Sequence, residues 1–125
     1  MITELHDVHV SRELAILLKK AGFNWACRGF FDDTGFHDGS VECTNYNSDT
    51  CKYLKAPTLE VAQKWLRETQ KYQVAVLPDG LKGYTFLCFL YNESITQPFK
   101  HYSTYEEALE AGIKKVLELI LMEGE

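Results

Sequence analysis

The segment of residues 84–91 constrains the fold more than any other, because its side chains are mostly apolar on both faces of an extended strand. One face carries Tyr84, Phe86, Cys88 and Leu90, and the other carries Thr85, Leu87, Phe89 and Tyr91. A strand with one face in water alternates apolar and polar residues instead. We therefore expect a central strand covered on both sides. The two helices predicted after residue 57 can cover one face. The other face must then be covered by the helix predicted near the N-terminus, by residues 25–31 or by a partner subunit.

Two further strands are predicted beside this central one. Residues 72–77 precede it across the turn Pro78-Asp79-Gly80, in which proline presets φ and glycine takes a positive φ. A shorter strand near residues 99–102 is expected to return before the last helix. The connections are short, so the sheet should be mainly antiparallel.

Apolar residues at helical spacing predict three helices, at about residues 11–21, 58–70 and 104–121. Ser11 and Thr58 can cap the first two, because their hydroxyls accept from orphan backbone N–H groups. Ser103 and Glu106 have the spacing of a capping box for the last helix.

Two glycines have predicted structural roles. Gly22 suits the left-handed residue that ends the first helix, with Phe23 packing back on Leu18 in a Schellman motif. Gly112 lies on the apolar side of the last helix, where it costs about 1 kcal/mol of helix propensity. We expect the compensation to be a close approach of this helix to the sheet or to the second helix.

These elements predict one α+β domain over residues 1–125, a two-layer sandwich with a mainly antiparallel sheet of three to five strands. Residues 24–56 are less regular. Their short aromatic pieces suggest a hairpin with strands near residues 25–31 and 36–44, followed by a polar loop.

The net charge and composition of the chain disfavour several classes of function. The formal net charge of −5 argues against nucleic acid and anionic membranes as partners, because phosphates attract basic surfaces. No apolar run approaches the roughly 20 residues of a membrane-spanning helix. The first residues lack the pattern of a signal peptide, so we expect a cytoplasmic protein with reduced cysteines. No cofactor is indicated.

The residues capable of chemistry do not form a recognised motif. Weak candidates for a zinc site are Cys27, His37, Cys43 and Cys51, which include no closely spaced ligand pair, so free thiols are favoured. A small enzyme would need Cys43 to meet His37 or His101 together with a carboxylate. The sequence favours a non-catalytic protein.

The element order after residue 57 resembles a double-stranded-RNA-binding domain, which makes a nucleic-acid-binding accessory protein the alternative. Such domains hold phosphates with basic residues at the start of the last helix. Here that start contains Glu106 and Glu107, which would repel phosphate.

Aromatic side chains in the irregular segment are the candidates for an interaction surface. These are Trp25, Phe30, Phe31, Phe36, Tyr46 and Tyr53. They could instead form a small satellite core.

Residues 56–68 and 105–117, together with Gly22-Phe23-Asn24-Trp25, resemble small uncharacterised proteins of bacteriophages and prophages in gut anaerobes. The shared features are structural, namely a helix entrance, a buried tryptophan and a capped last helix. The resemblance implies an accessory protein of a mobile element, located in the host cytoplasm if a phage encodes it, and it assigns no catalytic or binding residue. The missing catalytic motif and the strand that is apolar on both faces predict that the protein acts through contacts with a protein partner or a second copy.

Overall fold

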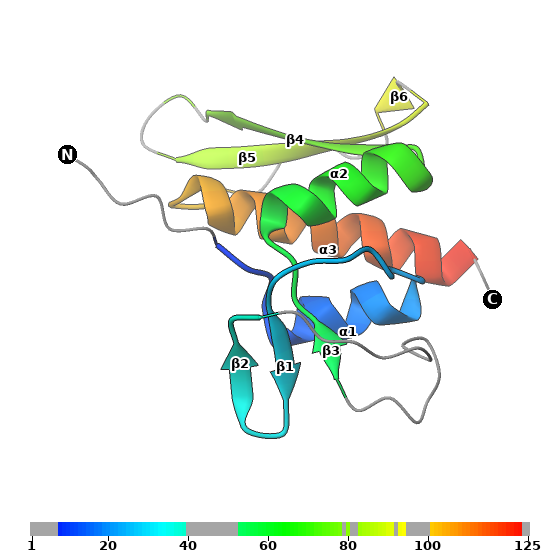
Figure 1. Cartoon of the computed structure of the whole chain (residues 1–125). Helices are drawn as coiled ribbons and strands as arrows, with labels where there is room; N and C mark the ends of the chain where they lie inside the picture. The colour runs from blue at the N-terminus through cyan, green and yellow to red at the C-terminus, as the bar shows by residue number, and fades with distance from the viewer. Residues whose placement is uncertain are drawn as a thin grey trace.

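The computed structural model describes residues 8–39, 53–78, 80, 83–91, 93–94 and 101–123. Within these residues it contains three helices and two three-stranded antiparallel sheets, which confirms the α+β class (Figure 1). In chain order the elements are α1 (Arg12–Lys20), β1 (Phe30–Asp32), β2 (Gly35–His37), β3 (Leu54–Lys55), α2 (Leu59–Thr69), β4 (Tyr72–Pro78), β5 (Tyr84–Leu90), β6 (Glu93–Ser94) and α3 (Tyr105–Glu123).

The two sheets lie on opposite sides of the helices. The β4–β5–β6 sheet packs on α2 and α3, whereas α1 lies on the other side of α3 and contacts β3 (Figure 1). The sequence led us to expect one sheet, but the strands of the irregular segment form a second one. They are only two or three residues long and pair with one another in the order β2–β1–β3. The predicted hairpin is present as β1 and β2, and residues 40–52 lie outside the described part.

The central position of β5 is confirmed. It pairs with β4 from Tyr72↔Leu90 to Pro78↔Tyr84 and with β6 on its other side. Of the strand predicted near residues 99–102, the described part is a single bridge between Tyr84 and Tyr102, in which each backbone N–H donates to the other's carbonyl at 2.8 Å.

The caps of the first two helices agree with the sequence prediction. The Ser11 hydroxyl accepts from the Leu14 N–H at 3.2 Å, and the Thr58 hydroxyl accepts from the Val61 N–H at 3.3 Å. The end of α1 is a Schellman motif. Gly22 has φ +99°, its N–H donates to Lys19, and the Phe23 N–H donates to Leu18.

The cap of α3 differs from the prediction by one residue. Thr104, not Ser103, precedes the helix, and its hydroxyl accepts from the Glu107 N–H at 3.0 Å. Ser103 instead donates its hydroxyl proton to the Glu107 carboxylate at 2.8 Å, and this bond lowers the pKa of Glu107. The capping box therefore joins Thr104 with Glu107, because Tyr105 is the first helical residue.

Gly112 marks the closest approach of α3 to the sheet, as predicted. A Cβ atom built there would lie 2.5 Å from Val74 Cγ1 and 3.2 Å from the Phe86 ring. Ile113 and Val116 beside it are fully buried. The helix thus rests with its backbone on β4 and β5, and this contact explains a glycine in the middle of a 19-residue helix.

Replacing Gly112 with alanine should destabilise the protein by up to about 2 kcal/mol. Overpacking against Val74 costs about 1–3 kcal/mol, and the gain in helix propensity returns about 1 kcal/mol. In a Val74→Ala background the clash is removed, so Gly112→Ala should become neutral or stabilising. Urea unfolding of the four variants measures this change of sign. Equal destabilisation in both backgrounds would contradict the contact.

Candidate functional site

The two faces of the β4–β5 hairpin have different surroundings. On the inner face Tyr72, Val74 and Cys88 are buried, with exposed fractions of 5%, 4% and 0%. Val76, Phe86 and Leu90 on the same face pack against the core that the helices form. This inner face therefore receives α2 and α3.

The outer face consists of the alternate side chains of the same strands, which are Gln73, Ala75, Leu77, Thr85, Leu87 and Phe89. In register, Ala75 lies opposite Leu87, with Phe89 and Leu77 toward the two ends. Leu77 is 38% exposed, Ala75, Leu87 and Phe89 are half-buried, and Thr85 is buried. None of these side chains belongs to the core cluster.

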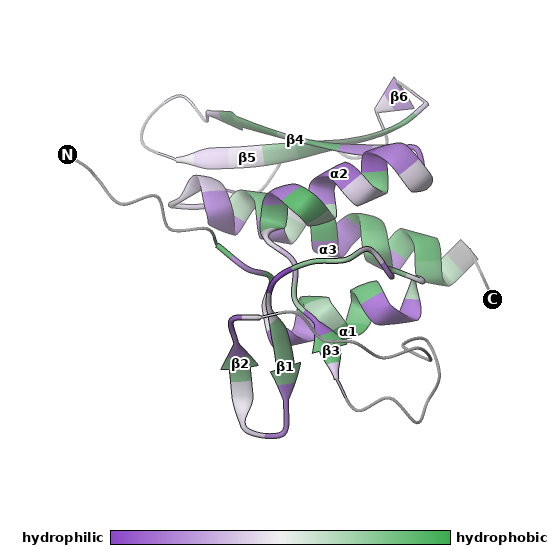
Figure 2. Cartoon of the chain, viewed as in Figure 1, coloured by the Kyte–Doolittle hydropathy of each residue, from purple (hydrophilic) through white to green (hydrophobic). Residues whose placement is uncertain are grey.

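None of the described helices covers the outer face. Figure 1 shows α2, α3, α1 and the small sheet all on the inner side of β4 and β5. Figure 2 shows that β4 and much of β5 are hydrophobic along their length. Of the coverings that the sequence allows, the first helix and residues 25–31 lie on the opposite side of α2 and α3 from this face.

Tyr91 follows β5 directly and is 72% exposed. Its backbone has φ +53°, a left-handed conformation that disfavours residues with a Cβ atom. An exposed tyrosine at a hairpin turn contributes little to the core.

Four of the predicted aromatic interaction residues meet in the small sheet. The Phe30 ring stacks on His37 with centroids 5.2 Å apart and meets Tyr53 edge-on at 5.7 Å. Phe31 meets Phe36 at 5.6 Å and lies under the Arg12 guanidinium. Phe36 and Tyr53 are 42% and 38% exposed, so this sheet is a second candidate surface.

The remaining two aromatic candidates do not join this sheet in the described structure. Trp25 is half-buried and packs against the core, with its ring 6.4 Å from Phe23. Tyr46 lies outside the described residues.

Of the residues proposed for metal binding and cysteine chemistry, the structure describes Cys27, His37 and His101. Burial raises the pKa of the Cys27 thiol, which disfavours the thiolate needed for either role. His37 interacts with Asp32 in the small sheet, whereas His101 lies beside α3. Cys43 and Cys51 lie outside the described residues. Within residues 8–39, 53–78 and the later described stretches, no group of three or more possible metal ligands occurs.

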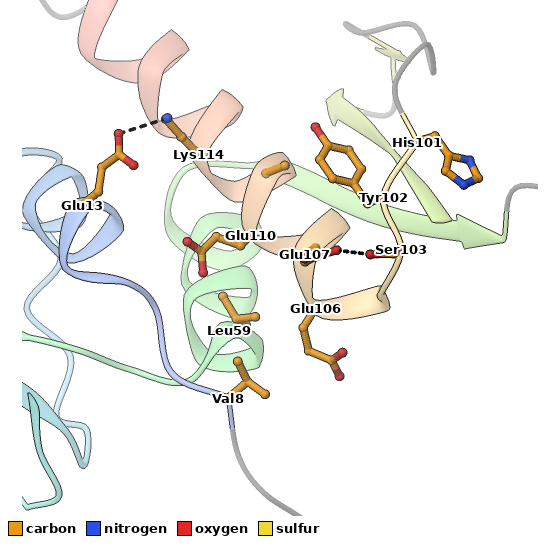
Figure 3. Close-up of a pocket in the computed structure, with 11 residues that line it drawn as sticks. Val8, Glu13, Leu59, His101, Tyr102, Ser103, Glu106, Glu107, Glu110 and Lys114 are labelled. Atoms are coloured by element: carbon orange, nitrogen blue, oxygen red, sulfur yellow. Dashed lines mark hydrogen bonds and ion pairs between the residues drawn. The ribbon is translucent and has the colours of Figure 1, made fainter. Parts of the chain in front are cut away.

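A groove of about 600 Å³ lies where the start of α3 meets the chain before α1 and the start of α2 (Figure 3). Val8 and Leu59 provide apolar lining. The walls carry four carboxylates and one ammonium group, from Glu13, Glu106, Glu107, Glu110 and Lys114. The sequence did not indicate this groove, because its residues come from three separate elements.

The charges of the groove have structural explanations. Lys114 Nζ lies 3.0 Å from the Glu13 carboxylate, and this hydrogen bond raises the pKa of Lys114 (Figure 3). Glu106 and Glu107 occupy the first turn of α3, where the helix dipole stabilises negative charge. Such a groove would repel phosphate, which argues further against nucleic-acid binding at the start of α3.

No protein-family model matches the sequence, and neither a curated protein nor a solved structure shows significant similarity to the chain. None of the described helices has the length and apolar character needed to cross a membrane.

The β1–β2 hairpin contains a carboxylate, Asp32, whose pKa lies below its usual range. Asp32 accepts from the Thr34 hydroxyl at 2.7 Å and the Thr34 N–H at 2.8 Å, and it lies 3.0 Å from His37 Nε2. These contacts, the Thr34 hydroxyl first, lower the pKa of Asp32 to about 2. The folded value is below the unfolded one of about 3.9, so the stabilisation is complete above about pH 4 and is lost as the pH falls through about 2.

A carbon-detected NMR titration of the Asp32 carboxyl group should therefore show a midpoint near pH 2. Thr34→Ala should move this midpoint upward toward about 3.9 while the fold is retained. A wild-type midpoint already near 3.9 would contradict the hydrogen-bond network.

Proposed function

We propose that this chain is a non-catalytic, phage- or prophage-associated accessory protein that acts through protein–protein contacts on the outer face of the β4–β5 hairpin. The association with a phage or prophage rests on the sequence resemblance. The mode of action rests on one observation, which is that a sheet apolar on both faces has described helices packed on only one of them.

The composition of the outer face supports this proposal. Ala75, Leu77, Leu87 and Phe89 occupy positions where an antiparallel strand in water would carry polar residues. Leu77 is exposed and the other three are half-buried, and apolar side chains gathered at a protein surface are typical of interaction sites. Among the described residues, no group of three or more possible metal ligands occurs.

Tyr91 adds a second line of support. Tyrosine supplies a large contact area with a polar tip and is enriched at interfaces. Here the ring is exposed at the end of β5 although its backbone conformation favours glycine or asparagine. A role in binding would explain why a tyrosine occupies a position whose backbone conformation lowers the local stability.

Leu77→Glu should abolish most of the protein's contacts, because it places a charge on the outer face. Ile16→Glu is the matched control, since Ile16 on α1 is 39% exposed and Leu77 is 38% exposed. Tagged proteins would be expressed with an untagged copy in host cells, cross-linked and purified. We expect Leu77→Glu to reduce captured polypeptides, whether host proteins or the untagged copy, about tenfold, because the new carboxylate would have to be buried against the partner.

The same capture experiment includes Tyr53→Glu, which places a charge on the small sheet at an equal exposed fraction of 38%. We expect it to behave like Ile16→Glu. Loss of capture with Tyr53→Glu but not with Leu77→Glu would transfer the contact surface to the small sheet and would refute the proposal.

Tyr91→Gly should separate stability from contact formation. Relief of the left-handed tyrosine should stabilise the fold by about 0.5–1 kcal/mol, after the entropic cost of glycine. Capture should nevertheless decrease. A thermal melt gives the first quantity and the capture experiment the second, and a destabilised variant with full capture would speak against the role of Tyr91.

A further inference from the structure

We infer that the partner bound at the β4–β5 hairpin contributes an extended peptide segment, which pairs as an additional strand along the edge of β4. This inference rests on the proposed function, because it specifies how a protein partner docks on the same hairpin. It is drawn from the backbone groups along this edge, whose pattern of donors and acceptors an extended backbone matches.

β4 is the terminal strand of its sheet. In the order β4–β5–β6 it has a described strand neighbour on one side only. It has seven residues and pairs with β5 without interruption. Natural sheets protect an edge of this length with a charged side chain, a bulge or a proline within the strand. β4 has none of these before Pro78, which is its last residue.

The direction of the backbone groups of β4 follows from bonds at the start of β5. Tyr84 and Tyr102 exchange both backbone hydrogen bonds at 2.8 Å, so the N–H and C=O of Tyr84 point away from β4. In an antiparallel ladder the residue paired with Tyr84, which is Pro78, then points its C=O away from β5. Because the direction alternates along a strand, the N–H and C=O groups of Val74 and Val76 also point toward the edge.

A bond from α2 agrees with this direction. Gln63 Nε2 donates to the Val74 carbonyl at 2.7 Å, which places that carbonyl on the edge and covers it with a side chain. Within the part of the chain that the structure describes, no other bond to the edge groups of Val74 or Val76 occurs. Val74 is buried, Val76 is half-buried and Pro78 is exposed, so the edge becomes more accessible toward the end of β4.

The pattern of these groups specifies the occupant. The edge offers the N–H of Val74, both backbone groups of Val76 and the C=O of Pro78. They recur at every second residue, about 6.8 Å apart, which is the repeat of an extended backbone and not of a helix. The occupant is therefore an extended segment of about five residues that binds by strand addition. Its side chains beside Ala75 and Leu77 should be apolar or β-branched, as in other cross-strand pairs.

Amide hydrogen exchange of the purified full chain tests whether the edge is open. The N–H groups of Ala75 and Leu77 bond to β5 and should exchange at least about tenfold more slowly than those of Val74 and Val76. Equal protection of all four amides would mean that the edge is already paired within the single chain, and it would overturn the inference.

An NMR titration tests strand addition. The probe is a peptide of about seven residues, the length of an ordinary strand, with lysine at each end, alternating threonine and valine between them, and blocked termini. It should shift the Val74 and Val76 amide signals and slow their exchange, with a dissociation constant of about 1 mM, as for a short segment held mainly by main-chain hydrogen bonds. The same peptide with methylated backbone nitrogens is the matched control and should not bind. Equal binding of the two peptides, or no saturable binding of the first, would overturn the inference.

Gln63→Ala tests the geometry of the edge. It uncovers the Val74 carbonyl, so the peptide should bind about three- to tenfold more tightly although the free chain becomes less stable. Gln70→Ala makes the same substitution at the end of α2 and should leave the binding constant unchanged. Lower stability with unchanged peptide binding would show that Gln63 has a structural role only, and would contradict the proposed pairing.

The outcomes separate this inference from the proposed function. If the peptide does not bind but Leu77→Glu still reduces capture from cells, strand addition is overturned and the outer face remains the contact surface. If the peptide binds but Leu77→Glu leaves capture unchanged, the proposed function fails and the edge of β4 still accepts a strand. If neither effect is observed, both proposals fail.

Discussion

The direct contact between the backbone of α3 and the β4–β5 hairpin holds together the main layer of the structure. Gly112 leaves no space for a side chain against Val74 and Phe86, so the helix lies unusually close to the strands. α2 packs beside it on the same face of the sheet, and α1 packs on its far side. The helices therefore separate the two sheets. As a result, none of the described helices covers the outer face of β4 and β5.

Much of this arrangement could be predicted from local sequence signals. Ser11, Thr58 and Gly22 specify helix ends through hydrogen bonds within a few residues, and the structure contains each of these bonds. The cap of α3 was misplaced by one residue, because Ser103 and Thr104 are both capping residues and Glu106 and Glu107 both follow at suitable spacing. Local chemistry allows both registers, and the structure adopts the second.

Features that depend on contacts between distant parts of the chain are harder to predict from the sequence. The alternation in β5 predicts two apolar faces, but it does not reveal which face the helices occupy. For the aromatic residues of the irregular segment, the sequence allows an interaction surface or a small satellite core. In the structure Trp25 packs on the core, whereas Phe30, Phe31, Phe36 and Tyr53 contact one another at the small sheet. The groove beside α3 has no sequence signature, because its walls come from distant parts of the chain.

The central claim is that the outer face is open in a single copy of the protein and becomes covered when a partner binds. Methyl NMR with a soluble nitroxide measures this directly. In dilute protein the Leu77 and Leu87 methyl signals should broaden strongly, while those of Leu66 and Leu117, which are fully buried, should not. The broadening at Leu77 and Leu87 should then decrease as a partner or a second copy binds. If Leu77 and Leu87 are as protected as Leu66 in the dilute monomer, another part of the chain covers the face and the account is wrong.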